Sequence, residues 1–494
     1  MQQLTGLDAS FLALETANTT GHVGGLSILD PAGAPKPLTL ARLSEVMAER
    51  LQLVPVLRQK LLNVPLGLDQ PYWIDDPDFD IEYHVRELAL PRPGSDAQLN
   101  EQVSRLHARP LDRSRPLWEI YLITGLAKKR AAVYTKIHHA AIDGASGAEL
   151  LTVLLDLTPA GRELPPVEPW HPEKAPSWAE LTARATAKAA WRPVQTVRIT
   201  NEMVKVLPTL APAVNTLVGG MLGLNRGDGE VIPTALGRAP ATPFNKPITP
   251  HRRFAFRSVD LDTVKKIKNV FGVSVNDVVM AMCAGALRRW LAGHDALPAQ
   301  PLIAMIPVSV RDPASKGALG NKVSAMLAML PTNVTEPGRR LEIVHQATRI
   351  AKAQQAAIPQ GLVDQISDFS PPALTARAAR VVFATGLLHR LPPFNVTISN
   401  VPGPNIPVYL CGAKLLAHYP VSVITAGQGL NMTVVGYLGR LHFGLTSCRE
   451  LVPDIETLAS YLVDELELLA KAAAHRANGS AARPAGATGQ AKRA

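Results

Sequence analysis

The sequence predicts an α/β fold made of two units joined by a proline-rich linker. Over residues 1–160, segments with the hydrophobic periodicity of strands alternate with segments that have the periodicity of helices. Residues 251–474 contain a second such series. Residues 161–250 begin rich in proline, continue as a helical crossover and end in a loop rich in glycine and proline. Residues 475–494 are polar and basic, and we expect a disordered tail.

Apolar periodicity predicts the elements of the N-terminal unit. Residues 38–53 space leucine, valine and methionine for one buried helix face, and residues 99–108 predict a second helix. The β-branched and aromatic segments of this unit predict strands. These segments are residues 24–29, 71–74, 81–85, 117–123 and 131–139.

Apolar periodicity also predicts the elements of the C-terminal unit. Residues 252–259 alternate as a strand, after which Asp260 or Asp262 can cap a helix that ends at Phe271. Residues 275–287 are almost wholly apolar and predict a buried helix. The other expected elements are a strand at 302–311, a strand and turn at 394–404, a hairpin at 434–444 and a closing helix at 455–474.

The linker contains one long stretch without charge. Residues 179–192 predict a basic helix, and residues 206–224 follow with no charged side chain. That length approaches a bilayer span, but Pro208 and Pro212 disfavour a spanning helix. We expect a packed helical crossover, and the alternative is an element that dips into a membrane or lipid droplet.

Composition limits the class of protein. The chain has 494 residues, 47% of them hydrophobic, so it can bury a large core, and wholesale disorder is excluded. The net charge of +10 suits a polyanionic partner such as an anionic membrane or a nucleotide-bearing substrate. No nucleic-acid-binding motif is present, and we expect no nucleic-acid partner. Three scattered cysteines and an N-terminus without signal-peptide character indicate a cytoplasmic protein.

Residues 131–150 hold the main candidate site. His138 and His139 come at the end of a predicted strand, Asp143 lies in the turn that follows, and Gly144 permits a sharp turn before the next helix. The two histidines point to opposite faces if the strand is regular, so one of them can face a given substrate as a general base. Asp143 can be a second base or an anion that pairs with an arginine.

Two other interpretations of these residues stay open at this point. Histidines in such a segment are often ordinary core residues. Histidine and aspartate also bind metals, but a third and a fourth ligand at recognisable spacing are missing, so we expect no metal site.

The pattern His138-His139-Ala-Ala-Ile-Asp143-Gly144 resembles the H-H-x-x-x-D-G signature of the CoA-dependent acyltransferase superfamily. Residues 4–12 and the Pro-Leu-Trp of residues 116–118 are similar to segments of one branch, the bacterial wax ester synthase/diacylglycerol acyltransferases. The resemblance implies two similar chloramphenicol-acetyltransferase-like halves with a tunnel at their interface, and His139 as the catalytic base. His138 is then a supporting residue. The resemblance also implies that the Pro-Leu-Trp segment supports the fold around the active site, so we assign it no chemistry.

Further residues match this branch. Arg311 ends a buried strand and, by the resemblance, pairs with Asp143 across the two halves, which makes that aspartate structural. Asn276-Asp277 matches an N-D motif near the reaction centre, although simple capping of the helix explains the pair equally well. Residues 399–404 resemble an S-N-V-P-G-P motif, and a hydroxyl of Thr397 or Ser399 is a candidate donor to an oxyanion, the alternative being an ordinary strand and turn.

The resemblance implies an O-acyltransferase that moves a long-chain acyl group from acyl-CoA to diacylglycerol or to a long-chain alcohol. No covalent acyl-enzyme and no cofactor are expected, since acyl-CoA is a co-substrate. Apolar acceptors suit peripheral association with the inner face of a membrane or with lipid droplets. The alternatives are a related acyltransferase acting on another alcohol or an amine, and a lipid-binding homologue without turnover.

Overall fold

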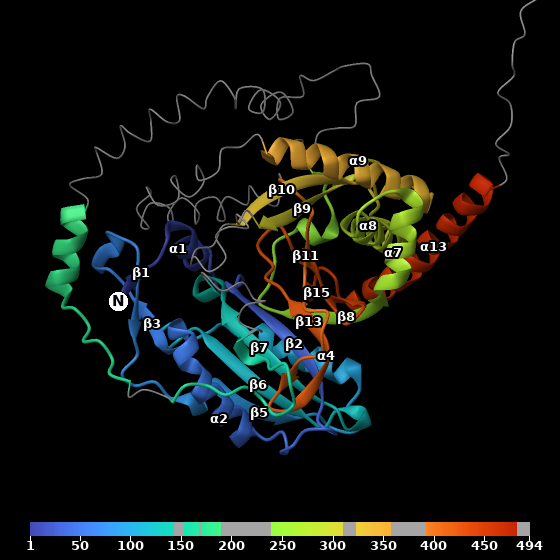
Figure 1. The fold of residues 1–494 in the computed structure, drawn as a ribbon. Helices are drawn as coiled ribbons and strands as arrows, with labels where there is room; N and C mark the ends of the chain where they lie inside the picture. Colours follow the sequence, from blue (N-terminus) through green and yellow to red (C-terminus); the bar gives the residue numbers. More distant parts are fainter. Residues whose placement is uncertain (143–152, 167–169, 189–238, 310–322, 357–391, 482–494) are drawn as a thin grey trace, which may run out of the picture.

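The structure is a computed structural model that describes residues 1–142, 153–166, 170–188, 239–309, 323–356 and 392–481 (Figure 1). These residues form two six-stranded sheets and one three-stranded sheet. The predicted α/β fold of two halves is confirmed. The tunnel between the halves stays a prediction.

The N-terminal lobe is built on a sheet of strand order β12-β13-β2-β7-β6-β5. All neighbours in it are antiparallel except β5 and β6, which are parallel. The strands are β2 (His22–Asp30), β5 (Val85–Ala89), β6 (Trp118–Thr124), β7 (Ala131–His138), β12 (Tyr409–Leu410) and β13 (Ala413–Val421).

One helix covers each face of this sheet. Helix α2 (Leu40–Arg50) packs Leu43 and Met47 into the cluster that contains Ile137. Helix α4 (Asp96–His107) packs Val103 into a second cluster with Tyr134 and Phe254, which belongs to the other lobe. Because β7 alternates its side chains, it contributes to both clusters, and α4 lies between the lobes.

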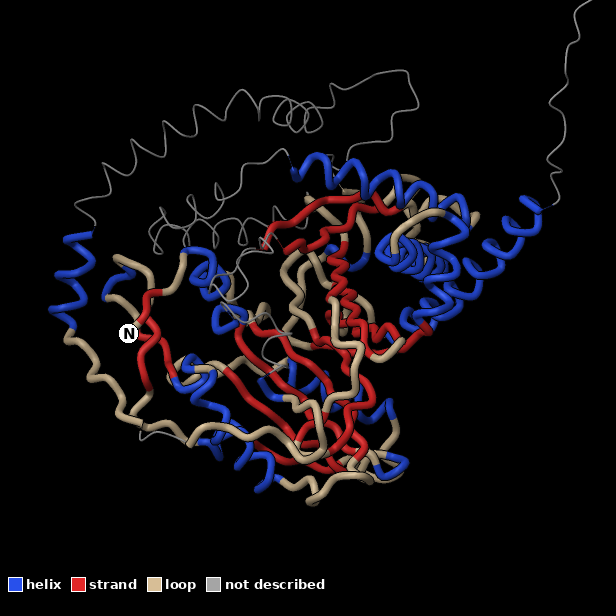
Figure 2. The backbone as a smooth tube through the Cα atoms, viewed as in Figure 1, coloured by secondary structure: helices blue, strands red, loops and turns tan. Residues whose placement is uncertain are grey.

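The C-terminal lobe is built on a sheet of order β10-β9-β11-β14-β15-β8. Its strands are β8 (Arg252–Asp260), β9 (Leu302–Ser309), β10 (Val323–Leu330), β11 (Val396–Val401), β14 (Leu430–Tyr437) and β15 (Arg440–Cys448). Its apolar face packs against helices, and Figure 2 shows these helices gathered on the outer side of the lobe. The helices are α7 (Leu261–Phe271), α8 (Val275–Gly293), α9 (Pro337–Ala356) and α13 (Ile455–Ala481).

The two sheets do not follow the division of the sequence at the linker. Strands β12 and β13 come from the C-terminal half, yet β13 pairs antiparallel with β2 and extends the N-terminal sheet. Close contacts between β13 and β15 then join the two sheets, with the Pro420 carbonyl lying where any Cβ at Gly444 would have to go. No pattern in the sequence predicts this exchange of strands.

A helix described over residues 178–188, where the sequence predicts a basic helix, and several shorter elements complete the described part of the chain. The three-stranded sheet has order β1-β4-β3 and packs near the N-terminus. Its strands are β1 (Gln2–Gln3), β3 (Gln59–Leu62) and β4 (Tyr72–Asp75). The short helices are α1 (Gly6–Ala13), α3 (Ile81–His84), η1 (Leu51–Leu53), η2 (Pro55–Arg58), η3 (Pro65–Gly67), η4 (Ala127–Lys129), η5 (His139–Ile142) and η6 (Pro243–Asn245).

Several predicted boundaries are wrong. The strand expected at residues 81–85 is the helical turn α3 followed by β5, because the Asp80 side chain accepts the Glu82 N–H and caps a helix there. The closing helix α13 continues to Ala481, so residues 475–481 do not belong to a disordered tail. Most of the helix expected after the turn at Gly144 lies outside the described residues, as does the whole stretch 206–224.

In the described part of the chain, no single helix is long and apolar enough to cross a membrane. Helices α7 and α8 are long and apolar enough only when taken together, and a bend of 102° separates them. The side chains of α8 are mostly buried in the core of the C-terminal lobe.

We predict that mild acid destabilises the fold. Burial lowers the pKa of His107 to about 3 and those of His139, His418 and His442 to about 4, and it also lowers the pKa values of His22 and His84. The unfolded chain therefore binds more protons between about pH 6.5 and pH 4, and stability falls as pH drops through that range. Each histidine contributes a loss of roughly 1.4 kcal/mol for each unit by which burial lowers its pKa.

The measurement is the midpoint of guanidinium unfolding at pH 7.5, 6 and 5. The midpoint should fall steadily over this series. The buried carboxylate of Glu15, with a pKa of about 2, contributes to acid lability only below about pH 4.5. A midpoint that stays constant from pH 7.5 to pH 5 would contradict the prediction.

Candidate active site

The two histidines lie in different local structures at the end of β7. Strand β7 ends at His138, and His139 begins the 3₁₀ turn η5, so the predicted strand is one residue too long. The backbone N–H of His139 donates to the Gly21 carbonyl at 2.8 Å, which ends the ladder between β2 and β7. Because His139 lies outside the strand, the alternation of side chains along β7 does not fix the direction of its ring.

His139 carries a half-buried imidazole under an aromatic ring. The Phe11 ring of α1 stacks on it, with centroids 3.9 Å apart and an interplanar angle of 20°. Burial lowers the pKa of His139 to about 4, and the charge that His138 can carry acts in the same direction. The ring is therefore neutral at pH 7, which is the form that a general base needs. Its Nδ1 has no hydrogen-bond partner among the described residues.

His138 is buried, with a hydrogen bond at one ring nitrogen and a carboxylate close to the other. Its Nδ1 accepts the Ala140 N–H at 3.1 Å, and its Nε2 lies 3.2 Å from Glu15 Oε1, within ion-pair range although outside hydrogen-bond geometry. Glycine at position 21 is required here, because a Cβ at Gly21 would lie 2.4 Å from Nε2 of this ring. His138 is thus a packed, supporting residue in the structure.

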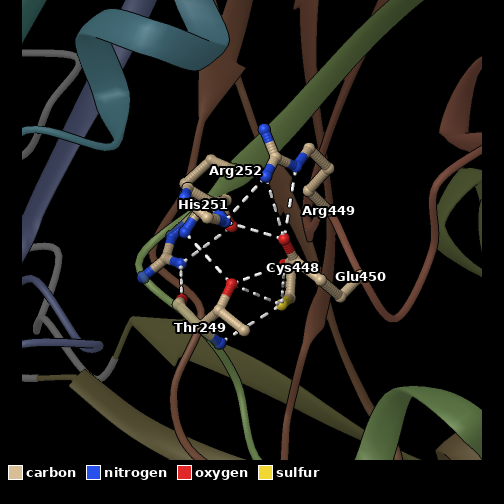
Figure 3. A network of polar contacts seen from close by, with 6 residues as sticks. All are labelled: Thr249, His251, Arg252, Cys448, Arg449 and Glu450. Carbon is tan, nitrogen blue, oxygen red and sulfur yellow. Dashed lines mark hydrogen bonds and ion pairs between the residues drawn. The ribbon is translucent and has the colours of Figure 1, made fainter.

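The loop after α1 is also held by the C-terminal lobe. Arg252 of β8 is buried and donates to the Asn18 carbonyl at 2.6 Å. It also donates to the carbonyls of Thr249 and His251, and burial lowers its pKa to about 10. Figure 3 shows the surrounding network, in which the carboxylate of Glu450 contacts Thr249, His251 and Cys448. The segment that carries Phe11 is therefore attached to both lobes.

Thr397 and Ser399 lie in β11 on the polar face of the C-terminal sheet. In the parallel ladder with β14, Thr397 is the register partner of Asn431, and Ser399 is the partner of Thr433. Neighbours in register share a face, and Ile398, which points the other way, belongs to the core beneath the helices. The polar face is thus directed toward the N-terminal lobe.

A buried polar network covers part of this face. Ser422, after β13, contacts the Thr433 hydroxyl at 2.8 Å and accepts from His107 Nε2 through its carbonyl at 3.2 Å. Asn431 accepts from Thr433 at 2.8 Å. Among the described residues, neither Thr397 nor Ser399 forms a hydrogen bond with His139, so their part in catalysis stays a prediction.

Asp277 caps α8 and binds α9. It forms a capping box with Ser274, accepts from Thr348 at 2.7 Å and lies 2.9 Å from His345 Nδ1. Burial tends to raise its pKa, but these hydrogen bonds lower the pKa overall. This geometry is that of the capping interpretation. Asn276, beside it, is half-buried, and contact of this pair with a substrate stays a prediction.

Some predicted site residues lie outside the described part of the chain. These are Asp143, Gly144 and Arg311, so their expected ion pair stays a prediction. No group of three metal-ligating side chains occurs among the described residues. Sequence reasoning missed Phe11, Glu15 and Gly21. The signal available for Phe11 was its place in residues 4–12, which resemble the opening segment of the family branch.

We predict that Phe11 sets the pKa of His139. The Phe11→Ala substitution removes the stacked ring and admits water, so the pKa of His139 should rise from about 4 toward its ordinary value near 6.5. The measurement is an NMR titration of histidine labelled at Cε1, with His139→Gln for assignment. Phe271→Ala, in the C-terminal lobe, is the control and should leave the curve unchanged; no shift with Phe11→Ala would refute the idea.

Models of two domains match most of the chain. The wax ester synthase/diacylglycerol acyltransferase catalytic domain matches residues 4–279, and the C-terminal domain of the same proteins matches residues 319–470. A probable diacylglycerol O-acyltransferase of Mycobacterium tuberculosis is 38% identical over 94% of this chain and 98% of its own. The O-acyltransferase WSD of Acinetobacter baylyi is 33% identical over 95% of this chain and 97% of its own.

A solved structure agrees with these sequence matches. The wax ester synthase/diacylglycerol acyltransferase from Marinobacter aquaeolei superposes with a TM-score of 0.67 at 32% identity, covering 96% of this chain and 100% of that one. The likeness therefore includes both lobes.

Proposed function

This chain belongs to the wax ester synthase/diacylglycerol acyltransferase family, and from that membership we propose that it transfers a long-chain acyl group from acyl-CoA to an acceptor hydroxyl. The acceptors are diacylglycerol, which gives triacylglycerol, and long-chain alcohols, which give wax esters. The observation that carries the proposal is the neutral, half-buried imidazole of His139, in a chain whose relatives bear these names.

His139 is the proposed general base. Its neutral ring takes the proton of the acceptor hydroxyl as the oxygen attacks the thioester carbonyl. The C–S bond then breaks, and the imidazolium returns the proton to the departing CoA thiolate. Because low dielectric disfavours the charged ring, imidazolium forms only when charge develops beside it in the transition state.

The cysteines support direct transfer without an acyl-enzyme. Burial raises the pKa of Cys283 to about 12 and that of Cys411 to about 11, so both thiols stay protonated and are poor nucleophiles. Cys448 is buried and contacts Glu450 and Thr249. Acyl-CoA is thus a co-substrate, and the proposed mechanism uses no cofactor.

Other residues have proposed supporting parts. Thr397, Ser399 or Asn276 donates to the oxyanion of the tetrahedral intermediate. The excess of basic side chains suits the phosphates of CoA and an anionic bilayer. Because both acceptors are apolar, we propose peripheral association with the inner face of a membrane or with lipid droplets in the cytoplasm.

The first test replaces the base. Purified enzyme with labelled palmitoyl-CoA and either hexadecanol or diolein should form ester, and His139→Ala should lower the rate at least about a hundredfold by removing general-base catalysis. His475→Ala, at an exposed histidine of α13, is the matched control and should retain the wild-type rate. Equal rates for wild type and His139→Ala would remove His139 from the mechanism.

The second test concerns the ion pair between Asp143 and Arg311. Arg311→Asp should reduce activity strongly, because it leaves two carboxylates in one place, and Asp143→Arg should do the same with two cations. The double variant restores opposite charges and should recover part of the activity. Losses that simply add in the double variant would show that the two residues do not pair.

A further inference from the structure

Glu15 connects the opening segment of the chain to the first histidine of the motif. Glu15 follows α1, and its two carboxylate oxygens contact different partners. Oε1 accepts the Gly21 N–H at 2.6 Å and lies 3.2 Å from His138 Nε2. Oε2 accepts from Nε of Arg113 at 2.9 Å. No motif or family match assigns a part to this carboxylate.

The carboxylate stays ionised although it is mostly buried. Its side chain is 15% exposed and that of His138 is 1% exposed. Burial tends to raise the pKa of Glu15, but contact with His138, the Gly21 amide and Arg113 lower that pKa to about 2. A full negative charge therefore faces His138 Nε2 throughout the working pH range, and this favours a proton on that nitrogen.

The tautomer of His138 decides what its other nitrogen does. With the proton on Nε2, which lies 3.2 Å from Glu15 Oε1, Nδ1 of the neutral ring is an acceptor, and it receives the Ala140 N–H at 3.1 Å. Ala140 directly follows His139, whose own N–H is bound to the Gly21 carbonyl at 2.8 Å. Glu15 thus fixes Gly21 on one side of the catalytic residue and, through His138, Ala140 on the other.

We propose that Glu15 is a positioning residue for acyl transfer, which holds the tautomer of His138 and thereby aims the imidazole of His139. The proposal rests on the proposed function of His139. The rival explanation is that Glu15 only attaches α1 to the sheet and that its loss costs stability alone. A misplaced base slows the chemical step while leaving substrate binding nearly unchanged.

The test compares Glu15→Gln with a matched pair on the surface. Glutamine keeps the size of the side chain but removes the charge. We expect kcat to fall roughly ten- to hundredfold, with KM for palmitoyl-CoA and for hexadecanol changed by less than about threefold. Glu101→Gln, which breaks the exposed ion pair with Arg105, should leave kcat unchanged.

A double-mutant cycle separates positioning from attachment. If Glu15 acts through His138, Glu15→Gln should have little further effect on kcat in a His138→Gln background. Losses of kcat that multiply in the double variant would support mere attachment and overturn the proposal. If Glu15→Gln does not fold by circular dichroism, Arg113→Gln replaces it in the cycle and should lower kcat in the same way by a smaller factor.

His139→Ala is measured in parallel to keep the two proposals apart. Wild-type activity in His139→Ala would refute the proposed function itself. An inactive His139→Ala together with a folded Glu15→Gln of wild-type kcat would refute only the part assigned to Glu15.

Discussion

Strand β2 is the element on which both lobes depend. On one side it pairs with β7, where His22 is the register partner of His138, and on the other it pairs with β13 from the C-terminal half. Gly24 permits this close packing, since a Cβ there would lie 2.6 Å from the Thr135 carbonyl. The residue before the strand, Gly21, binds both Glu15 and His139. A shift of β2 would therefore move the histidines and the lobe interface together.

Desolvation is the second constraint. It disfavours the charged form of both His139 and Glu15, yet the two groups end in opposite charge states. The His139 ring is deprived of water and stays neutral, whereas Glu15, although mostly buried, keeps its charge because an amide, an arginine and a histidine surround it. The neutral imidazole of His139 and the ionised carboxylate of Glu15 thus lie close together in the resting enzyme. Both properties come from the packing of α1 against the end of β7.

Much of the fold could be predicted from the sequence, because local signals agree with the tertiary structure. The Asp260 cap, the apolar run of α8 and the hairpin of β14 and β15 were all predicted and are all observed. The segment 81–85 failed because its alternation suits a strand while Asp80 caps a helical turn. Pairing of β13 with β2 carries no local signal, since it depends on residues far apart in the chain.

The candidate site divides in the same way. His139 was recognisable from the seven-residue pattern around it, and capping by Asp277 from its place in the first turn of α8. Phe11 and Glu15 were not recognisable, because stacking on a ring and pairing with a buried imidazole are contacts between distant segments. The parts of Asp143, Arg311, Thr397 and Ser399 remain predictions.

The pairing of β2 with β13 also has a consequence for synthesis on the ribosome. Ser27 contacts His418 across a separation of 391 residues, so the N-terminal sheet stays incomplete until almost the whole chain has been translated. Until then β2 presents an unpaired edge to solvent, and such edges promote aggregation. Folding of this enzyme should therefore be slow and largely post-translational, and it should depend on chaperones that shield nascent strand edges.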